Sequence, residues 1–134
     1  MKFAAAIALA CLTASAAFAA DARKINFSAE IQDENGTPIV ECANPSNILS
    51  TDPACKERRT VTLGIIAFRA LSAAEQGVSP DDNLLRGQLA LSLYKGGEVE
   101  LTAEQVVLVK KRIGSTFSPV IVARCFPLLD PAIK

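Results

Sequence analysis

The sequence predicts an α+β domain that is mainly helical, with an N-terminal β-hairpin packed on three to four helices in the order ββαααα. Three observations support this prediction. Residues 24–32 alternate between apolar and polar side chains, which is typical of a half-buried strand. Residues 33–36, with the sequence DENG, form a turn signal. Beyond residue 60 the chain carries repeated helix-start signals, each followed by an apolar segment.

The N-terminal segment has the features of a hairpin. The second strand of this hairpin, residues 37–41, contains Pro38 and is expected at a sheet edge because proline has no N–H to donate. An EF-hand loop starting at Asp33 would need a glutamate at its twelfth position, where the chain has Asn44. We therefore interpret the turn as a hairpin turn without a calcium site.

Two apolar helices follow. The first, residues 62–74, begins at Thr62 as N-cap and is apolar nearly all round, so it should be largely buried. The second begins at Ser79 and Pro80, which combine an N-cap with a proline in the first helical position. Its leucines cover most of the circumference and leave only a narrow strip of Gln88, Ser92 and Lys95, which predicts the central helix of the domain; these leucines are Leu84, Leu85, Leu89, Leu91 and Leu93.

Two further helices complete the predicted fold. After a brief extended link at 98–101, Thr102 and Gln105 form a capping box for a helix that ends at Gly114. One face of this helix carries Val106, Val107, Val109 and Ile113, and the opposite face carries Glu104, Gln105, Lys111 and Arg112. Leu108 lies on the polar side and is interpreted as a single exposed apolar residue. The last helix begins at Ser118 and is expected to break at Pro127.

The first 19 residues have the pattern of a cleaved signal peptide. Lys2 precedes an uncharged apolar stretch, and Ala17 and Ala19 occupy the −3 and −1 positions of a cleavage site after Ala19. Cleavage leaves residues 20–134 as a single small globular domain, which is periplasmic or secreted. Two alternatives are a membrane helix, for which the apolar stretch is short, and lipidation at Cys11.

The mature chain would contain Cys42, Cys55 and Cys125. Disulfides form in oxidising compartments, and the Cys42–Cys55 pair closes the shortest loop, so we predict a disulfide-closed loop at 42–55. Free thiols and a metal site are the alternatives, although a metal needs more ligands than two thiolates. Cys125, next to Val122 and Phe126, is predicted to be a small buried apolar residue, with an intermolecular disulfide as the alternative.

The composition argues against several function classes. The chain has no His, which excludes Ser–His and Cys–His catalysis and histidine-ligated metals, and we predict no cofactor, no metal and no catalytic residues. Without Lys2 the basic residues number 14 − 1 = 13 against 14 acidic residues, so the net charge is −1. We therefore expect no nucleic-acid partner and no membrane contact after cleavage. The short basic run at 56–59 is interpreted as a solvated loop, and that at 110–112 as a helix C-terminus whose cations match the helix dipole.

Residues 60–130 resemble small uncharacterised proteins encoded in prophages and bacterial genomes. In these proteins a short hairpin precedes a helix that begins with the sequence TLG, here Thr62 to Gly64, followed by a region similar to residues 84–130. The resemblance implies a hairpin-and-helix fold but no activity and no functional residue. The signal peptide and the insertion that carries Cys42 and Cys55 depart from the family's cytoplasmic, cysteine-poor pattern, and imply an exported version with a secured loop.

These observations predict an exported, non-catalytic protein-interaction module of unknown specific role. Its partner is expected to be another protein, which would contact the hairpin edge or the disulfide loop. One alternative is a small hydrolase that uses carboxylates such as Asp82, Glu98 and Glu100. Another is a structural or stress-related periplasmic protein.

Overall fold

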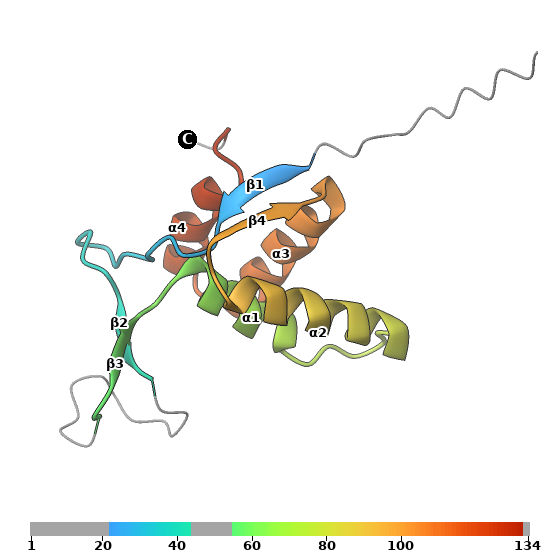
Figure 1. Ribbon diagram of the computed structural model, residues 1–134, viewed down its shortest axis with the longest axis horizontal. Helices are drawn as coiled ribbons and strands as arrows, with labels where there is room; N and C mark the ends of the chain where they lie inside the picture. The colour runs from blue at the N-terminus through green and yellow to red at the C-terminus, as the bar shows by residue number, and fades with distance from the viewer. Residues whose placement is uncertain (1–21, 44–54, 133–134) are drawn as a thin grey trace, which may run out of the picture.

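The computed structural model describes residues 22–43 and 55–132, and it shows an α+β fold that is mainly helical, as predicted (Figure 1). The predicted signal peptide at residues 1–19, with Cys11, and Asn44 lie outside these residues. The described residues form four helices and two small antiparallel sheets. In chain order the elements are β1 (Arg23–Asn26), β2 (Val40–Cys42), β3 (Arg58–Thr60), α1 (Leu63–Ser72), α2 (Pro80–Tyr94), β4 (Glu98–Leu101), α3 (Ala103–Thr116) and α4 (Pro119–Leu129).

The two sheets pair strands that are distant in sequence. β1 lies antiparallel to β4, with Ile25 opposite Val99. β2 lies antiparallel to β3, with Cys42 opposite Arg58. Residues 98–101, predicted as an extended link, form β4, and β3 begins within residues 56–59, predicted as a solvated loop. A strand of three or four residues is too short for its alternation to be recognised.

The predicted hairpin is present but short. Gln32 and Pro38 form a single bridge, and the Ile39 N–H donates to the Ile31 carbonyl oxygen at 2.9 Å. The Asp33 side chain closes the turn, because its Oδ1 accepts hydrogen bonds of 2.9 Å from the N–H of Asn35 and from that of Thr37. The turn at 33–36 therefore forms as expected, whereas the regular strand pairing on its N-terminal side is made with β4.

The alternation across residues 24–32 holds for burial although β1 ends at Asn26. Ile25, Phe27 and Ile31 are buried, and the polar residues between them are exposed. The segment changes partner along its length, since the Phe27 N–H donates to Gly97 and the Ile31 N–H donates to Val61. Period-two burial thus persists through a backbone that is not one continuous strand.

The helix at the centre of the domain is α1 and not α2. All residues from Leu63 to Ala67 are buried, as are Ala70 and Leu71, and α1 packs against both α2 and α3. In α2 only Arg86, Ala90 and Leu93 are buried, so the prediction that α2 is central was wrong. Leucines spread around a helix do not distinguish a buried helix from one with an apolar outer surface, because the burial of each leucine depends on which elements pack against it.

The helix-capping predictions agree with the structure at the N-termini. Thr62, Ser79 and Thr102 each accept a backbone N–H through the side chain, and Thr102 and Gln105 form the complete capping box. The C-termini differ from expectation. α3 continues past Gly114 to Thr116, and α4 continues past Pro127 to Leu129. Pro127 lies in the last turn, where the loss of one N–H does not prevent the helix from finishing.

The arrangement leaves two peripheral parts around a common core. In Figure 1 the β2–β3 pair projects away from the helices, and α2 lies along one side of the molecule. The fully buried side chains of the core come from all four helices, from β4 and from the segment after β1, and they include Phe27, Leu63, Leu93, Leu101, Ile113 and Leu129. The β2–β3 pair and the outer side of α2 lie outside this core.

Candidate functional site

A groove with a volume of about 600 Å³ lies between α2 and α3. Its apolar lining comes from Leu85 and Leu89 of α2 and from Leu108 of α3. Leu85 is 63% exposed, whereas Leu89 and Leu108 are half-buried against the core. Leu108 is thus not an isolated surface leucine, as the sequence suggested, but one wall of this groove.

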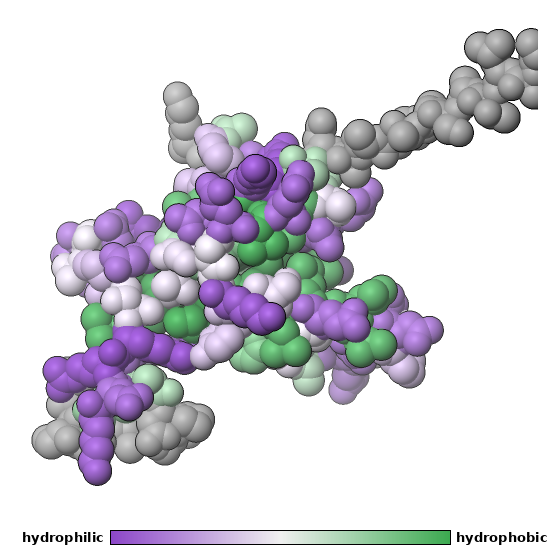
Figure 2. Space-filling model, viewed as in Figure 1, coloured by the Kyte–Doolittle hydropathy of each residue, from purple (hydrophilic) through white to green (hydrophobic). Residues whose placement is uncertain are grey.

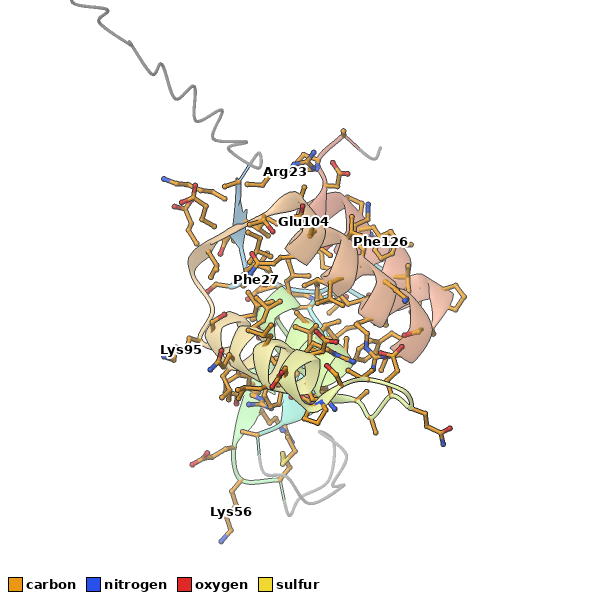
Figure 3. All side chains as sticks on the ribbon, turned by 90° about the vertical axis from the view of Figure 1, so that its right-hand side faces the viewer. Arg23, Phe27, Lys56, Lys95, Glu104 and Phe126 are labelled. Carbon is orange, nitrogen blue, oxygen red and sulfur yellow. A yellow bond between two sulfur atoms is a disulfide. The ribbon has the colours of Figure 1, made fainter. Side chains whose placement is uncertain are left out.

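The rim of the groove is acidic. The lining includes Asp82 near the start of α2 and Glu104 at the start of α3 (labelled in Figure 3), with Gln88, Ser92 and Gln105 as neutral polar residues. Asp82 Oδ2 accepts a hydrogen bond of 2.8 Å from the Ser79 hydroxyl. Arg86 also lines the groove, but it is buried and its Nη1 lies 2.9 Å from Glu75 Oε2, so the exposed charges of the rim are those of Asp82 and Glu104.

A buried ionic cluster supports the walls of the groove. Glu75 Oε2 accepts from Nη1 of Arg86 and lies 3.0 Å from Nη1 of Arg112, and these arginines are 7% and 5% exposed. Arg112 also donates to the carbonyl oxygens of Ala70 and Ala73 at the C-terminal end of α1. A cation at this end of a helix satisfies free carbonyls and the helix dipole. The cluster therefore ties α2 and α3 to the end of α1.

This cluster corrects two interpretations from the sequence. Arg112 was assigned to a polar, solvated face of the third helix together with the run 110–112, but it is buried. Val107 was assigned to the apolar face, but it is 65% exposed. The true face of α3 is rotated towards Arg112 because the end of α1 offers carbonyl groups that only a donor can satisfy.

The outer surface of α2 is unusually apolar for a helix of a small domain. Leu84, Leu85 and Leu91 are 61%, 63% and 59% exposed. Figure 2 shows green, apolar atoms over α2 between purple, polar ones. Single exposed leucines are common, whereas several on one helix make an exposed apolar surface.

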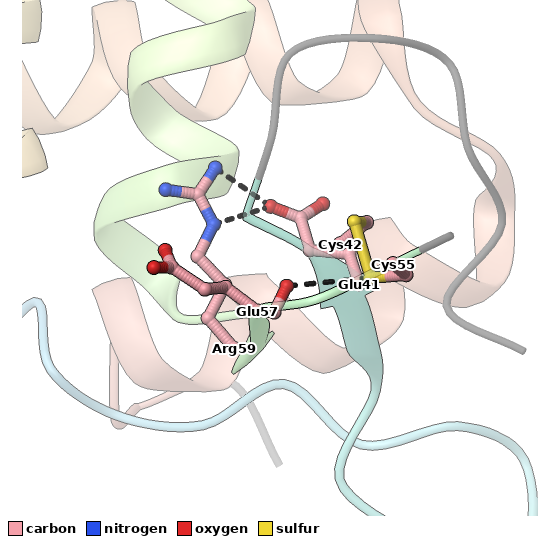
Figure 4. Close-up of a disulfide and its surroundings, with 5 residues drawn as sticks. All are labelled: Glu41, Cys42, Cys55, Glu57 and Arg59. Atoms are coloured by element: carbon pink, nitrogen blue, oxygen red, sulfur yellow. Dashed lines mark hydrogen bonds and ion pairs between the residues drawn. A yellow bond between two sulfur atoms is a disulfide. The ribbon is translucent and has the colours of Figure 1, made fainter. Parts of the chain in front are cut away.

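The projecting β2–β3 pair carries the predicted cysteine bridge (Figure 4). Cys42 and Cys55 lie at disulfide distance, with their Cα atoms 5.6 Å apart, and both side chains are buried. This pairing fits an oxidising, extracytoplasmic location. Residues 44–54 of the loop lie outside the described residues. The contact surface proposed for the loop therefore stays a prediction.

An ionic cluster beside the disulfide attaches the strand pair to the helices. Glu41 accepts from Arg59 of β3 at 2.8 Å and from Arg69 of α1 at 2.7 Å. Arg59 also donates to the hydroxyl of Tyr94 in α2 at 2.7 Å, and the Tyr94 ring lies 5.0 Å from that of Phe68. Arg59 was expected in a solvated basic run, but it joins β3 to α2.

The third cysteine is inside the core. Cys125 of α4 is fully buried and has no disulfide partner among the described residues, as expected of a small apolar core residue. Burial raises the pKa of its thiol to about 12, because the thiolate would be poorly solvated. An intermolecular disulfide would need this sulfur to become exposed.

The carboxylates of the hydrolase alternative lie on different elements. Glu98 and Glu100 alternate along β4, where they are opposite Asn26 and Lys24 of β1 and exposed. Asp82 lies in the first turn of α2 and lines the α2–α3 groove, whose lining does not include Glu98 or Glu100. This groove therefore brings only one of the three residues into a hollow.

The described residues contain neither a cluster of metal ligands nor a helix that could cross a membrane. Between residues 22 and 43 and between 55 and 132, no three His, Cys, Asp or Glu side chains gather as a metal site would require. In the same part of the chain, every helix is too short or too polar to cross a membrane.

Comparisons of the chain with protein-family models, with curated proteins and with solved structures found no match. The resemblance to prophage-encoded and bacterial small proteins therefore stays a prediction, and the site is interpreted from its own geometry. The groove could not be predicted from the sequence because its shape depends on how α2 and α3 pack relative to each other, which local patterns do not give. The available signal was the excess of leucines in α2 together with Leu108.

Proposed function

We propose that the protein is a small exported, non-catalytic interaction module whose α2–α3 groove receives an apolar segment of a protein partner. The observation that carries this proposal is the exposed Leu85 beside the half-buried Leu89 and Leu108 in a hollow of about 600 Å³. Apolar grooves between helices commonly hold amphipathic helices of partner proteins. The disulfide at Cys42–Cys55 supports export, because such bridges persist in oxidising compartments.

The charges around the groove specify the chemistry of the partner segment. The rim is acidic because Asp82 and Glu104 are exposed, whereas Arg86 is buried. A complementary segment would present two or more apolar side chains to the leucines and lysine or arginine residues to the rim. Electrostatic complementarity of this kind chiefly raises the association rate, and salt weakens it.

Site-specific photo-crosslinking in the native compartment tests this proposal. A crosslinking amino acid at Leu108 should trap one protein through an apolar segment flanked by basic residues, and Leu85→Glu should abolish trapping. The matched control carries the same amino acid at Glu34, which is exposed in the 33–36 turn. Equal trapping from Glu34, or a trapped segment that is acidic, would reject the groove as the contact surface.

Deletion of residues 43–54 separates the groove from the surface first expected from the sequence. If the partner contacts the disulfide loop, the deletion abolishes capture while folding is retained. If the partner contacts the groove, capture survives the deletion and is lost in Leu85→Glu. A purified protein that turns over a substrate, with turnover lost on Asp82→Asn or Glu98→Gln, would replace the proposal with the hydrolase alternative.

A further inference from the structure

The outer side of α2 carries a line of exposed residues that borders the groove only at Gln88. Leu84 and Leu91 are seven residues apart, so they lie two turns apart on one side of the helix. The opposite side is the one that packs on α1, through Arg86, Ala90 and Leu93. No contact within the described chain therefore accounts for an apolar line at this position.

This line has a regular spacing and a regular order of charge. It consists of Asp81, Leu84, Gln88, Leu91 and Lys95, at alternating intervals of three and four residues, and all are exposed; we call it the outer strip. Alternating intervals of three and four are the spacing by which two helices pack along a shared seam. Among the described residues neither Asp81 nor Lys95 has an ion-pair partner. Figure 3 shows Lys95 at the edge of the molecule.

The outer strip is complementary to itself. Asp81 and Lys95, which carry opposite charges, lie seven residues before and after Gln88, and Leu84 and Leu91 lie four residues before and three after it. In an antiparallel pair of identical strips, Leu84 of each copy meets Leu91 of the other. Asp81 of each copy then faces Lys95 of the other, which is the reciprocal contact that a two-fold interface requires.

Gly87 is an independent observation at the same place. It lies inside α2, next to the centre of the outer strip, and glycine is a poor helix former. A Cβ at this position would meet nothing within 4 Å, so packing within the chain does not require a glycine. A missing side chain at the centre of a helix surface lets a second backbone approach closely.

We propose that a second copy of this chain docks on the outer strip, so that two α2 helices pack antiparallel around a two-fold axis near Gln88. This inference goes beyond the proposed function and does not depend on it. The groove residues Leu85 and Leu89 lie on the flank of α2 that faces α3, and not in the strip. Gln88 borders both surfaces, but the leucines that would contact the partner and those that would contact the second copy are different.

Sedimentation equilibrium of the purified, disulfide-bonded protein tests the dimer. The wild-type protein should show a concentration-dependent monomer–dimer equilibrium, and Leu91→Glu should abolish it. The matched control is Val107→Glu, which changes an equally exposed apolar residue on α3 and should leave the equilibrium unchanged. A wild-type protein that is monomeric at all concentrations up to about 1 mM, a weak affinity limit, would overturn the proposal.

Charge exchange tests the antiparallel arrangement. Asp81→Lys and Lys95→Asp should each weaken the dimer about tenfold at low salt, because each change affects two equivalent pairs. The double variant should recover the wild-type affinity. A mixture of the two single variants should form a heterodimer, because every facing pair is then oppositely charged. A dimer that the double variant does not restore would contradict this register.

Gly87→Ala separates an effect on the dimer from a general loss of stability. The added methyl should weaken the dimer, while the thermal midpoint of the dilute monomer stays equal or rises because alanine is the better helix former. A dimer unaffected by this substitution would contradict close approach at Gly87.

Discussion

Gly64 lies where three parts of the chain meet. A Cβ on this residue would be 2.4 Å from the Leu93 carbonyl oxygen at the end of α2 and 3.1 Å from that of Phe27. The Gly64 N–H also donates to Phe27 at 2.9 Å. The glycine therefore lets the first turn of α1 contact the end of α2 and the residue after β1. This contact gives a physical reason for the glycine in the TLG sequence at the start of α1.

Gly64→Ala is expected to lower the free energy of unfolding by about 2 kcal/mol, because both contacting atoms belong to the backbone and cannot turn away. Chemical denaturation monitored by circular dichroism measures this change. Gly114→Ala is the matched control. Its Cβ would make an ordinary contact of 3.8 Å with Phe126, so stability should be equal or slightly higher. Equal losses for both variants would contradict the role of close approach at Gly64.

We expect the buried thiol of Cys125 to make the protein less stable at alkaline pH. Burial raises the pKa of its thiol from 9.0 to about 12, so above pH 9 the unfolded chain releases this proton while the folded chain retains it. The contribution to stability is fully present below pH 9 and is lost as the pH rises towards 12. At pH 10 the loss should be about 1 kcal/mol.

Denaturation of the wild type and of Cys125→Ala between pH 8 and 11 isolates this effect, because other groups titrate equally in both proteins. The alanine variant should have a lower stability at pH 8 but a shallower decline above pH 9. Parallel declines in the two proteins would show that the thiol is not held in its neutral form by the core.

At the scale of elements, the β2–β3 pair depends on side-chain links more than on its own length. Each strand has three residues, and isolated two-stranded pairs are marginal in water. The pair is held by the Cys42–Cys55 bridge at one end and by Glu41, Arg59 and Tyr94 against the helices. The bridge closes a loop with a sequence separation of 13.

Cys42→Ser is expected to lower the free energy of unfolding by about 3 kcal/mol, the loop entropy that the bridge removes from the unfolded chain. Thermal denaturation with and without reductant measures this. Reductant should lower the midpoint of the wild type to a value close to that of the variant, and it should not change the Cys42→Ser/Cys55→Ser double variant. A wild-type midpoint that is insensitive to complete reduction would contradict a stabilising bridge.

At the scale of the whole molecule, the prediction of export can be tested on the mature protein. The mature protein should begin at Ala20 and carry one disulfide, with the Cys125 thiol protected from alkylation until the chain unfolds. Intact-mass measurement of periplasmic material, with and without a thiol reagent under denaturing conditions, checks all three points. Recovery with the initiating Met, or with a lipid on Cys11, would favour the membrane alternatives.

Local features of the fold could be predicted from the sequence because their causes lie within a few residues. The caps at Thr62, Ser79 and Thr102 depend on one side chain and the next turn of backbone. The turn at Asp33 and the alternating burial of residues 24–32 also follow from local chemistry. The Cys42–Cys55 pairing could be predicted because a short loop brings its ends together most readily.

The sequence by itself thus determined the helical α+β class, the helix starts and the cysteine pair of this protein. Only the tertiary structure decided which helix is central, that β1 pairs with β4, and that Arg86 and Arg112 are buried on a shared Glu75. The same holds for the α2–α3 groove and for the exposed side of α2. The physical reason is that burial and strand pairing depend on surfaces from distant segments, and an arginine or leucine has no fixed environment until its neighbours are in place.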